Sequence, residues 1–259
     1  MTYTASILVT GASSGLGAGL AKSYAAPGVR LALTARDAQR LEATAAACRT
    51  QGAEVVTGLF DVAEAAPLGA WLLEQDAIAP FDILLPCAGV SAGTTVEGEP
   101  EGLELATMQV RANLLGTINT IEPLLPRLIA RKAGRIATIA SSAALRGLAY
   151  SPAYSASKAG VRAYGEGLRA LLTPKGISVT VVVPGFFDTP MTDRWKGPTP
   201  FIVSLDKMVS VIRAGVDRKA KRITYPRLLA LGQQAADLMP AAWGDKIMRN
   251  FHFHIEPGR

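Results

Sequence analysis

A phenol and an amine lie four residues apart at Tyr154 and Lys158, in the run YSASK. On a helix this spacing places both side chains on one face, one turn apart. A cation beside a phenol favours the phenolate, so we expect the pKa of Tyr154 to fall from about 10 toward neutral pH. The pair would then serve as an acid and base, with the hydroxyls of Ser141 and Ser142 shortly before it. For this spacing alone, the alternative is a solvated helix face.

A glycine-rich turn near the start of the chain is a second, independent feature that supports a functional role for that pair. The apolar run 6–9 precedes TGASSGLG at 10–17, and a helix-compatible stretch continues from 18 to 26. Glycines let the backbone turn tightly and approach a ligand, and the first amides of the helix would face an anion. The turn predicts a dinucleotide site, and a glycine-rich connection without a ligand is the alternative.

Short β-branched or leucine-rich runs alternate with alanine-rich stretches. This alternation predicts an α/β fold, a single-domain Rossmann-like three-layer sandwich around a mostly parallel sheet of about seven strands, with ligands at the carboxyl ends of the strands. The predicted strands are 7–9, 30–35, 54–60, 83–85, 135–140, 178–183 and 222–225. The predicted helices are 15–26, 38–51, 64–75, 102–131, 153–173, 204–220 and 227–250.

The domain organisation follows from this pattern. We expect a catalytic dinucleotide-binding domain over residues 1–226 and a helical extension of the same domain over 227–259. Pro123 and Pro126 should bend or interrupt the helix at 102–131 because proline lacks the amide donor that a helix interior needs.

Composition restricts the class of protein. The chain has 259 residues, 49% of them hydrophobic, which is enough for one α/β domain with a large core. No apolar run reaches the length of a membrane span and no leader is recognised, so a cytoplasmic protein is expected. The net charge of +6 is spread singly, with one modest basic cluster over 213–222, which favours a solvated surface over a nucleic-acid site.

The cysteines and histidines do not form a recognisable framework. Cys48 and Cys87 are expected to be free thiols, since two cysteines in a chain of this length make no disulfide scaffold. His252 and His254 lie near the C-terminus without cysteines or an acidic cluster, so no metal site is predicted.

Several separate motifs in a consistent order resemble the short-chain dehydrogenase/reductase family. The resemblance extends over residues 4–192. The motifs that carry it are TGASSGLG at 10–17, Ser141, YSASK at 154–158 and Pro184-Gly185.

The resemblance implies a role for each residue of the candidate catalytic group. Tyr154 would exchange a proton with the substrate oxygen, and Lys158 together with the oxidised nicotinamide would lower the pKa of Tyr154. Lys158 would also bind the nicotinamide ribose. A serine would orient the carbonyl, and the family's spacing to the tyrosine favours Ser141 over Ser142. Asn113 matches a helix asparagine that is implied to anchor a water in a proton relay through Lys158. Without the resemblance, Asn113 would be interpreted as a buried polar residue that kinks a helix.

The choice of cofactor depends on the residues after the second predicted strand. A carboxylate there binds the ribose 2′-hydroxyl of NAD, whereas an arginine pairs with the 2′-phosphate of NADP. Ala35 occupies the carboxylate position and Arg36 follows, so NADP is predicted over NAD. The family's other NADP feature, a basic residue within the glycine turn, is absent because Ser14 occupies that position. Asp37 is interpreted as the N-cap of the next helix. By resemblance, the cofactor-binding residues are Gly11, Ser13, Ser14, Gly15, Leu16, Gly17, Arg36, Asp61, Val62, Ala88, Gly89, Tyr154, Lys158, Pro184, Gly185 and Thr189.

The chain departs from the family where Pro86 and Cys87 replace the usual pair of asparagines. The backbone of Ala88 and Gly89 could still contact the cofactor, but the asparagine side chains are lost. Cys87 is interpreted as a small apolar packing residue rather than a nucleophile, because no histidine lies near it in sequence.

Aromatic residues after Pro184-Gly185 predict an apolar substrate pocket. Met191 belongs to the same segment. The expected substrate-binding residues are Ser141, Tyr154, Phe186, Phe187 and Trp195.

The C-terminal segment repeats apolar residues at spacings of three and four, which predicts an amphipathic helix broken at Pro240. The helix would cover the domain or pack on a partner chain; a lid over the substrate and a membrane-surface contact are the alternatives. The repeating residues are Leu228, Leu231, Ala235, Leu238, Met239, Trp243, Ile247 and Phe251.

Together these features predict an NADP-dependent oxidoreductase that interconverts an apolar ketone or aldehyde and its alcohol. The alternative is a regulator on the same fold that senses NADP without turnover. The helices at 102–131 and 153–173 match those that pair subunits in the family, which implies a homodimer or homotetramer.

Overall fold

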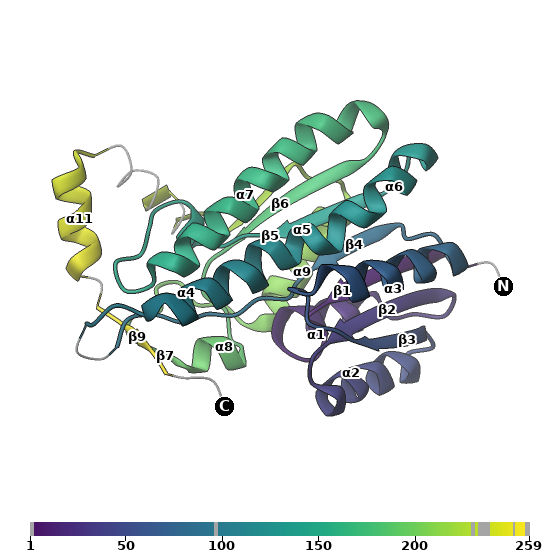
Figure 1. Ribbon diagram of the computed structural model, residues 1–259, viewed down its shortest axis with the longest axis horizontal. Helices are drawn as coiled ribbons and strands as arrows, with labels where there is room; N and C mark the ends of the chain where they lie inside the picture. Colours follow the sequence, from purple (N-terminus) through teal and green to yellow (C-terminus); the bar gives the residue numbers. More distant parts are fainter. Residues whose placement is uncertain (1–2, 96–97, 229–230, 233–238, 251, 257–259) are drawn as a thin grey trace.

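The central sheet confirms the predicted fold class. The computed structural model describes residues 3–95, 98–228, 231–232, 239–250 and 252–256. Within these residues, seven parallel strands form a sheet in the order β3-β2-β1-β4-β5-β6-β8 (Figure 1). The strands are β1 (Ala5–Thr10), β2 (Val29–Ala35), β3 (Glu54–Leu59), β4 (Ile83–Pro86), β5 (Arg135–Ile139), β6 (Ser178–Pro184) and β8 (Arg222–Tyr225).

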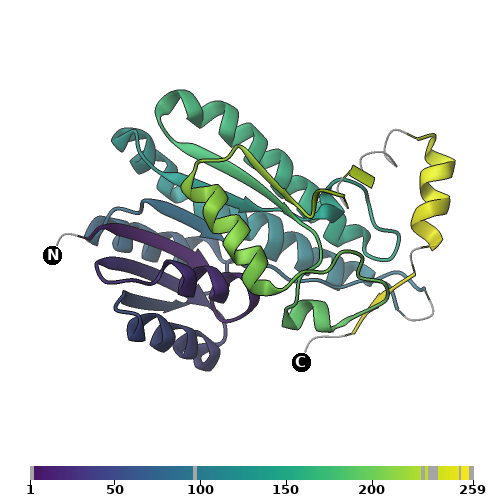
Figure 2. The same ribbon diagram turned by 180° about the vertical axis from the view of Figure 1, so that it is seen from behind.

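Helices cover both faces of this sheet, which is why its central strands are continuous apolar runs. One face carries α1 (Gly15–Tyr24), α2 (Ala38–Thr50) and α9 (Leu205–Asp217), which pack in one apolar core with β1, β2 and β6 (Figure 2). The other face carries α3 (Ala65–Ile78), the long helical segment 102–131 and α7 (Pro152–Leu172).

The segment 102–131 is helical throughout but not uniform. It consists of α4 (Gly102–Gln109), a π-helical segment, α5 (Gly116–Ile121), a 3-10 turn and α6 (Leu125–Arg131). Pro123 lies in the 3-10 turn, so the expected interruption there is confirmed. Asn113 lies fully buried in the π-helical segment Val110–Leu115, a form often found at functional sites.

A small antiparallel sheet was not predicted. The chain leaves β6 through the short helix α8 (Pro190–Asp193) and β7 (Trp195–Lys196), and β7 pairs with β9 (His254–Ile255). The C-terminal segment therefore returns to the loop that follows β6 (Figure 1).

The predicted C-terminal helix is described only in part. Helix α11 (Ala241–Asn250) begins directly after Pro240, where a break was expected. It lies at the outer edge of the molecule, where Asp245 forms an ion pair with Arg146 (3.0 Å) and Trp243 is 69% exposed. Predictions for Ala235, Leu238, Phe251 and the side chain of Ile247 fall outside the described residues.

Candidate active site

A cavity of about 510 Å³ opens at the carboxyl ends of β1, β2, β3 and β4. Its volume lies in the range of cofactor sites. We call it the first cavity; its lining is Gly11, Ser13, Ser14, Gly15, Leu16, Gly17, Ala35, Arg36, Asp37, Arg40, Phe60, Asp61, Val62, Cys87, Ala88, Gly89, Val90, Ala112, Phe187, Thr189, Pro190 and Met191. Twelve of the sixteen predicted cofactor residues are among them, because the other four, Tyr154, Lys158, Pro184 and Gly185, line a second cavity.

The glycine turn has the geometry that a dinucleotide phosphate needs. Gly11 and Gly15 have φ of 66° and 50°, and a Cβ on Gly11 would lie 2.6 Å from the Cα of Ala88. A side chain at either position would therefore strain or crowd the turn. In the described part of the chain, the hydroxyl of the N-cap residue Ser14 makes no capping hydrogen bond, and the first residues of α1, Gly15, Leu16 and Gly17, line the cavity, so their amides could bind a phosphate.

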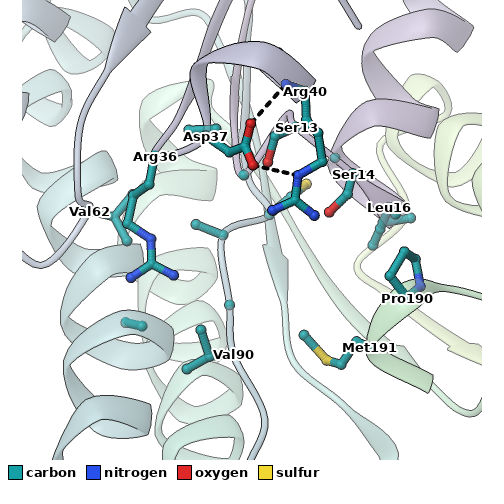
Figure 3. A pocket seen from close by; sticks show the side chains of 18 of the residues that line it. Ser13, Ser14, Leu16, Arg36, Asp37, Arg40, Val62, Val90, Pro190 and Met191 are labelled. Carbon is teal, nitrogen blue, oxygen red and sulfur yellow. Dashed lines mark hydrogen bonds and ion pairs between the residues drawn. The ribbon is translucent and has the colours of Figure 1, made fainter. Parts of the chain in front are cut away.

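Two arginines extend into the first cavity from the β2 edge (Figure 3). Arg36 follows β2, is 63% exposed and forms an ion pair with Asp61 at 3.5 Å. Arg40 lies on the first turn of α2, near Ser14, and its Nε donates to Asp37 at 2.7 Å. Asp37 also accepts from the Arg40 amide at 2.8 Å, which confirms its prediction as an N-cap.

The second cavity, of about 140 Å³, contains the candidate catalytic group. Leu16, Gly89 and Thr189 line both cavities, so the two adjoin. Its lining is Leu16, Cys87, Gly89, Ser91, Ile139, Ala140, Ser141, Ser142, Ala143, Leu148, Tyr154, Lys158, Pro184, Gly185, Phe186, Phe187, Thr189, Met191, Thr192 and Trp195. The predicted substrate-binding residues are all present.

Within this cavity the sheet and α7 bring three functional groups together. Ser141 follows β5, and its hydroxyl forms a hydrogen bond with Tyr154 that favours the phenolate. The ammonium of Lys158 lies 5.9 Å from the Tyr154 ring centroid and donates to the carbonyl oxygen of Ile139 at 3.0 Å. Ser142 also lines the cavity, but Ser141 is the serine that interacts with the phenol.

The expected fall in the pKa of Tyr154 is wrong for the protein alone. Burial raises the pKa of Tyr154, and the hydrogen bond from Ser141 offsets this only in part. Burial also lowers the pKa of Lys158 to about 8, although the nearby Cys87 acts in the opposite direction. The sequence argument counted a neighbouring charge and not the loss of solvent, which here has the larger effect.

Asn113 lines neither cavity but links the loop after β4 to α7. Its Nδ2 donates to the carbonyl oxygen of Val90 (3.0 Å) and to the hydroxyl of Ser157 (2.9 Å), and its Oδ1 accepts from the Val90 amide (2.8 Å). A Cβ on Gly89 would lie 3.0 Å from that Oδ1 and 3.5 Å from the Lys158 ammonium. Asn113 thus fixes the loop after β4 beside Lys158.

Pro86 and Cys87 do not disrupt the wall between the cavities. Pro86 pairs with Thr10 in the sheet, and the Thr10 hydroxyl accepts from the Ala88 amide at 3.3 Å. Cys87 lines both cavities, and burial raises the pKa of its thiol to about 12, so it remains protonated at neutral pH.

Sequence reasoning missed two residues near the site. Arg40 could have been found, because it lies one helical turn after the N-cap Asp37 and so faces the same edge. Phe253 could not, because no local pattern relates it to Trp195, on which its ring stacks at 3.6 Å.

Comparisons with known proteins agree with this geometry. The sequence model of the short chain dehydrogenase family matches residues 5–198. An uncharacterized oxidoreductase of Myxococcus xanthus is 33% identical over 90% of this chain and 92% of the relative. The ketoacyl reductase HetN of Nostoc sp. is 32% identical over 81% of this chain and 73% of the relative. A solved short-chain dehydrogenase from Sphingobium yanoikuyae, in complex with NADPH, superimposes with a TM-score of 0.78 at 28% identity over 96% of both chains.

The chain therefore belongs to the short chain dehydrogenase family. It is an oxidoreductase with a nicotinamide cofactor and a small-molecule substrate. No helix among the described residues is long and apolar enough to cross a membrane. The same residues contain no group of three or more His, Cys, Asp or Glu side chains that could hold a metal ion.

Proposed function

We propose that this protein is an NADP-dependent oxidoreductase that interconverts an apolar ketone or aldehyde and its alcohol. The observation that carries the proposal is the meeting of Ser141, Tyr154 and Lys158 in a small cavity that adjoins one of cofactor size. When bound, the reduced nicotinamide would supply a hydride to the carbonyl carbon and become oxidised.

The chain's own residues would supply the proton and position the substrate. Ser141 would donate a hydrogen bond to the carbonyl oxygen, and Tyr154 would transfer its phenolic proton to that oxygen as the alcohol forms. Because burial raises the pKa of Tyr154, the phenol is protonated at neutral pH. This is the form that can donate a proton when the carbonyl is reduced. Lys158, with its pKa near 8, would carry most of its charge there and stabilise the phenolate that remains.

NADP is proposed over NAD because two arginines line the first cavity just after β2, and an arginine can pair with a 2′-phosphate. Arg36 and Arg40 both line it, and the guanidinium of Arg36, which is 63% exposed, could pair bidentately with a phosphate in place of its ion pair with Asp61. The only carboxylates in its described lining are Asp37 and Asp61, and each already bonds an arginine side chain. The NADPH complex of the 28% identical structure supports this choice.

Turnover of NADPH with a panel of ketones and aldehydes tests the proposal. Tyr154→Phe should lower kcat by about a hundredfold or more, since it removes the general acid, and should leave NADPH binding intact. Tyr164→Phe is the matched control, because its hydroxyl lies on the same helix and bonds Glu122 at 2.7 Å, outside both cavities. Tight NADPH binding with no turnover of any carbonyl by the native chain would instead favour an NADP sensor.

We also propose a cytoplasmic homodimer or homotetramer. The segment 102–131 carries three exposed leucines that a partner chain could cover: Leu103, Leu105 and Leu115, which are 85, 40 and 43% exposed. Light scattering of the native chain and of Leu115→Glu would test this assembly, and a native monomer would contradict it.

A further inference from the structure

The size of the second cavity limits what can bind beside Tyr154. Its volume of about 140 Å³ is close to the ~150 Å³ of an apolar cavity that holds one benzene ring. Apolar side chains from β5, from β7 and from the segments that follow β5 and β6 contribute to its wall. They are Ile139, Ala143, Leu148, Phe186, Phe187 and Trp195.

The charge of the lining limits the substrate further. Among the described residues that line the second cavity, Lys158 is the only one with a formal charge. Its ammonium already donates to the carbonyl oxygen of Ile139, 3.0 Å away. A carboxylate or phosphate on the substrate would lose its water without gaining a matching cation, and such burial is unfavourable.

Trp195 lines the second cavity, and two other aromatic rings pack against it. Its ring meets Phe186 edge to face at 5.0 Å and stacks on Phe253 at 3.6 Å with 16° between the planes. Its indole nitrogen donates to the carbonyl oxygen of Pro198 at 3.2 Å, which sets the orientation of the ring. Phe253 is 6% exposed and lines neither cavity, so it acts on the cavity through Trp195.

The backbone pairing of β7 and β9 keeps Phe253 in place. Trp195 pairs with Ile255, and the Glu256 amide donates to the carbonyl oxygen of Arg194 at 2.9 Å. The side-chain Nε of Arg194 in turn donates to the carbonyl oxygen of Glu256 at 2.7 Å. Gly197 allows the close approach, since a Cβ there would lie 2.6 Å from the Cβ of Phe253. The C-terminal strand is thus part of the substrate-binding structure.

We propose that the substrate is a neutral ketone, or its secondary alcohol, whose larger substituent is no bigger than one aromatic ring. Phe253 is the positioning residue that sets this limit by holding Trp195 against the cavity. This inference rests on the proposed function and names the substrate class of the same site.

Steady-state reduction by NADPH of four carbonyl compounds tests the size and charge limits. Acetophenone should have the highest kcat/KM, by about tenfold or more over 2-acetonaphthalene, the charged benzoylformate and a 3-ketoacyl thioester. A native preference for benzoylformate, the naphthyl ketone or the thioester would overturn the inference and leave the proposed function standing. Reduction of none of the four, with NADPH bound, would overturn both.

Variants of Phe253 test the positioning role. Phe253→Leu should raise KM for acetophenone about tenfold with kcat within about threefold, and should raise the naphthyl-to-phenyl ratio of kcat/KM by a similar factor. Phe253→Tyr keeps the stacked ring and should restore native values. Trp243→Ala, which removes the exposed aromatic side chain of α11, is the matched control. It should change neither the KM for acetophenone nor the naphthyl-to-phenyl ratio of kcat/KM.

NADPH binding, measured by fluorescence, reports whether each variant is folded. Trp195→Ala enlarges the cavity directly and should shift the ratio of the two ketones in the same direction, which keeps the inference testable if Phe253→Leu folds poorly. An unchanged ratio in a variant that binds NADPH normally would overturn the role of the Phe253 and Trp195 stack.

Discussion

Replacing Lys158 with methionine tests how far a buried charge beside Tyr154 lowers the free energy of unfolding. Lys158 is 7% exposed, and burial lowers its pKa from 10.5 to about 8. At about 1.4 kcal/mol per pKa unit, this difference lowers the free energy of unfolding by about 3 kcal/mol at pH 7, where the amine is charged in both states. Methionine removes that charge but also the hydrogen bond to Ile139, worth about 2 kcal/mol because its donor is charged. Lys158→Met should therefore be more stable than the native chain at pH 7 by about 1 kcal/mol.

The advantage of methionine should disappear as the pH rises. The folded pKa lies below the unfolded one, so between about pH 8 and 10.5 the unfolded state binds a proton that the folded state has lost. Native stability then gains about 1.4 kcal/mol per pH unit from this group, and the variant gains nothing. Burial raises the pKa of Tyr24 and Tyr164 and so works against stability at high pH, but equally in both proteins. The difference between the two proteins isolates Lys158.

Urea unfolding followed by circular dichroism at pH 7, 8, 9 and 9.5 would measure this difference. Lys207→Met, at an exposed position at the start of α9, is the control and should show no such trend. A stability difference that stays constant over this range, or a variant less stable than the native chain at pH 7, would refute the argument that burial dominates at Lys158.

The remaining predictions concern the first cavity and the core. Arg36→Ala should weaken NADPH binding by about 10- to 100-fold and NADH binding by less than about threefold in fluorescence titrations, and equal losses would contradict the 2′-phosphate assignment. Asp76→Asn should lower the free energy of unfolding in urea by about 3 kcal/mol, because this buried carboxylate accepts hydrogen bonds from Arg131 and the Phe81 amide. A decrease under about 1 kcal/mol would argue against a stabilising role for this buried ion pair. Gly17→Ala should weaken NADPH binding about tenfold or more, since its Cβ would strike the backbone of the turn; the control Gly167→Ala, with open space around it, should instead stabilise α7 by about 0.5–1 kcal/mol.

Much of the fold could be predicted because its signals are local. Each apolar run of the parallel sheet lies between helix-compatible stretches, and the observed strand bounds fall within two residues of those expected. Asp37 was recognisable as an N-cap because a cap acts within one turn of its own residue. The π-helical segment around Asn113 carried no such signal, since it arises where the helix packs against the loop after β4.

The sequence by itself determined the parallel sheet, the glycine turn and the presence of Tyr154 and Lys158 on one helix face, because these depend on neighbours along the chain. Tertiary structure decided the protonation of that pair, since burial comes from distant elements and outweighs the charge four residues away. It also decided the surroundings of the second cavity, because the pairing of β7 with β9 brings Phe253, the residue before β9, onto the ring of Trp195.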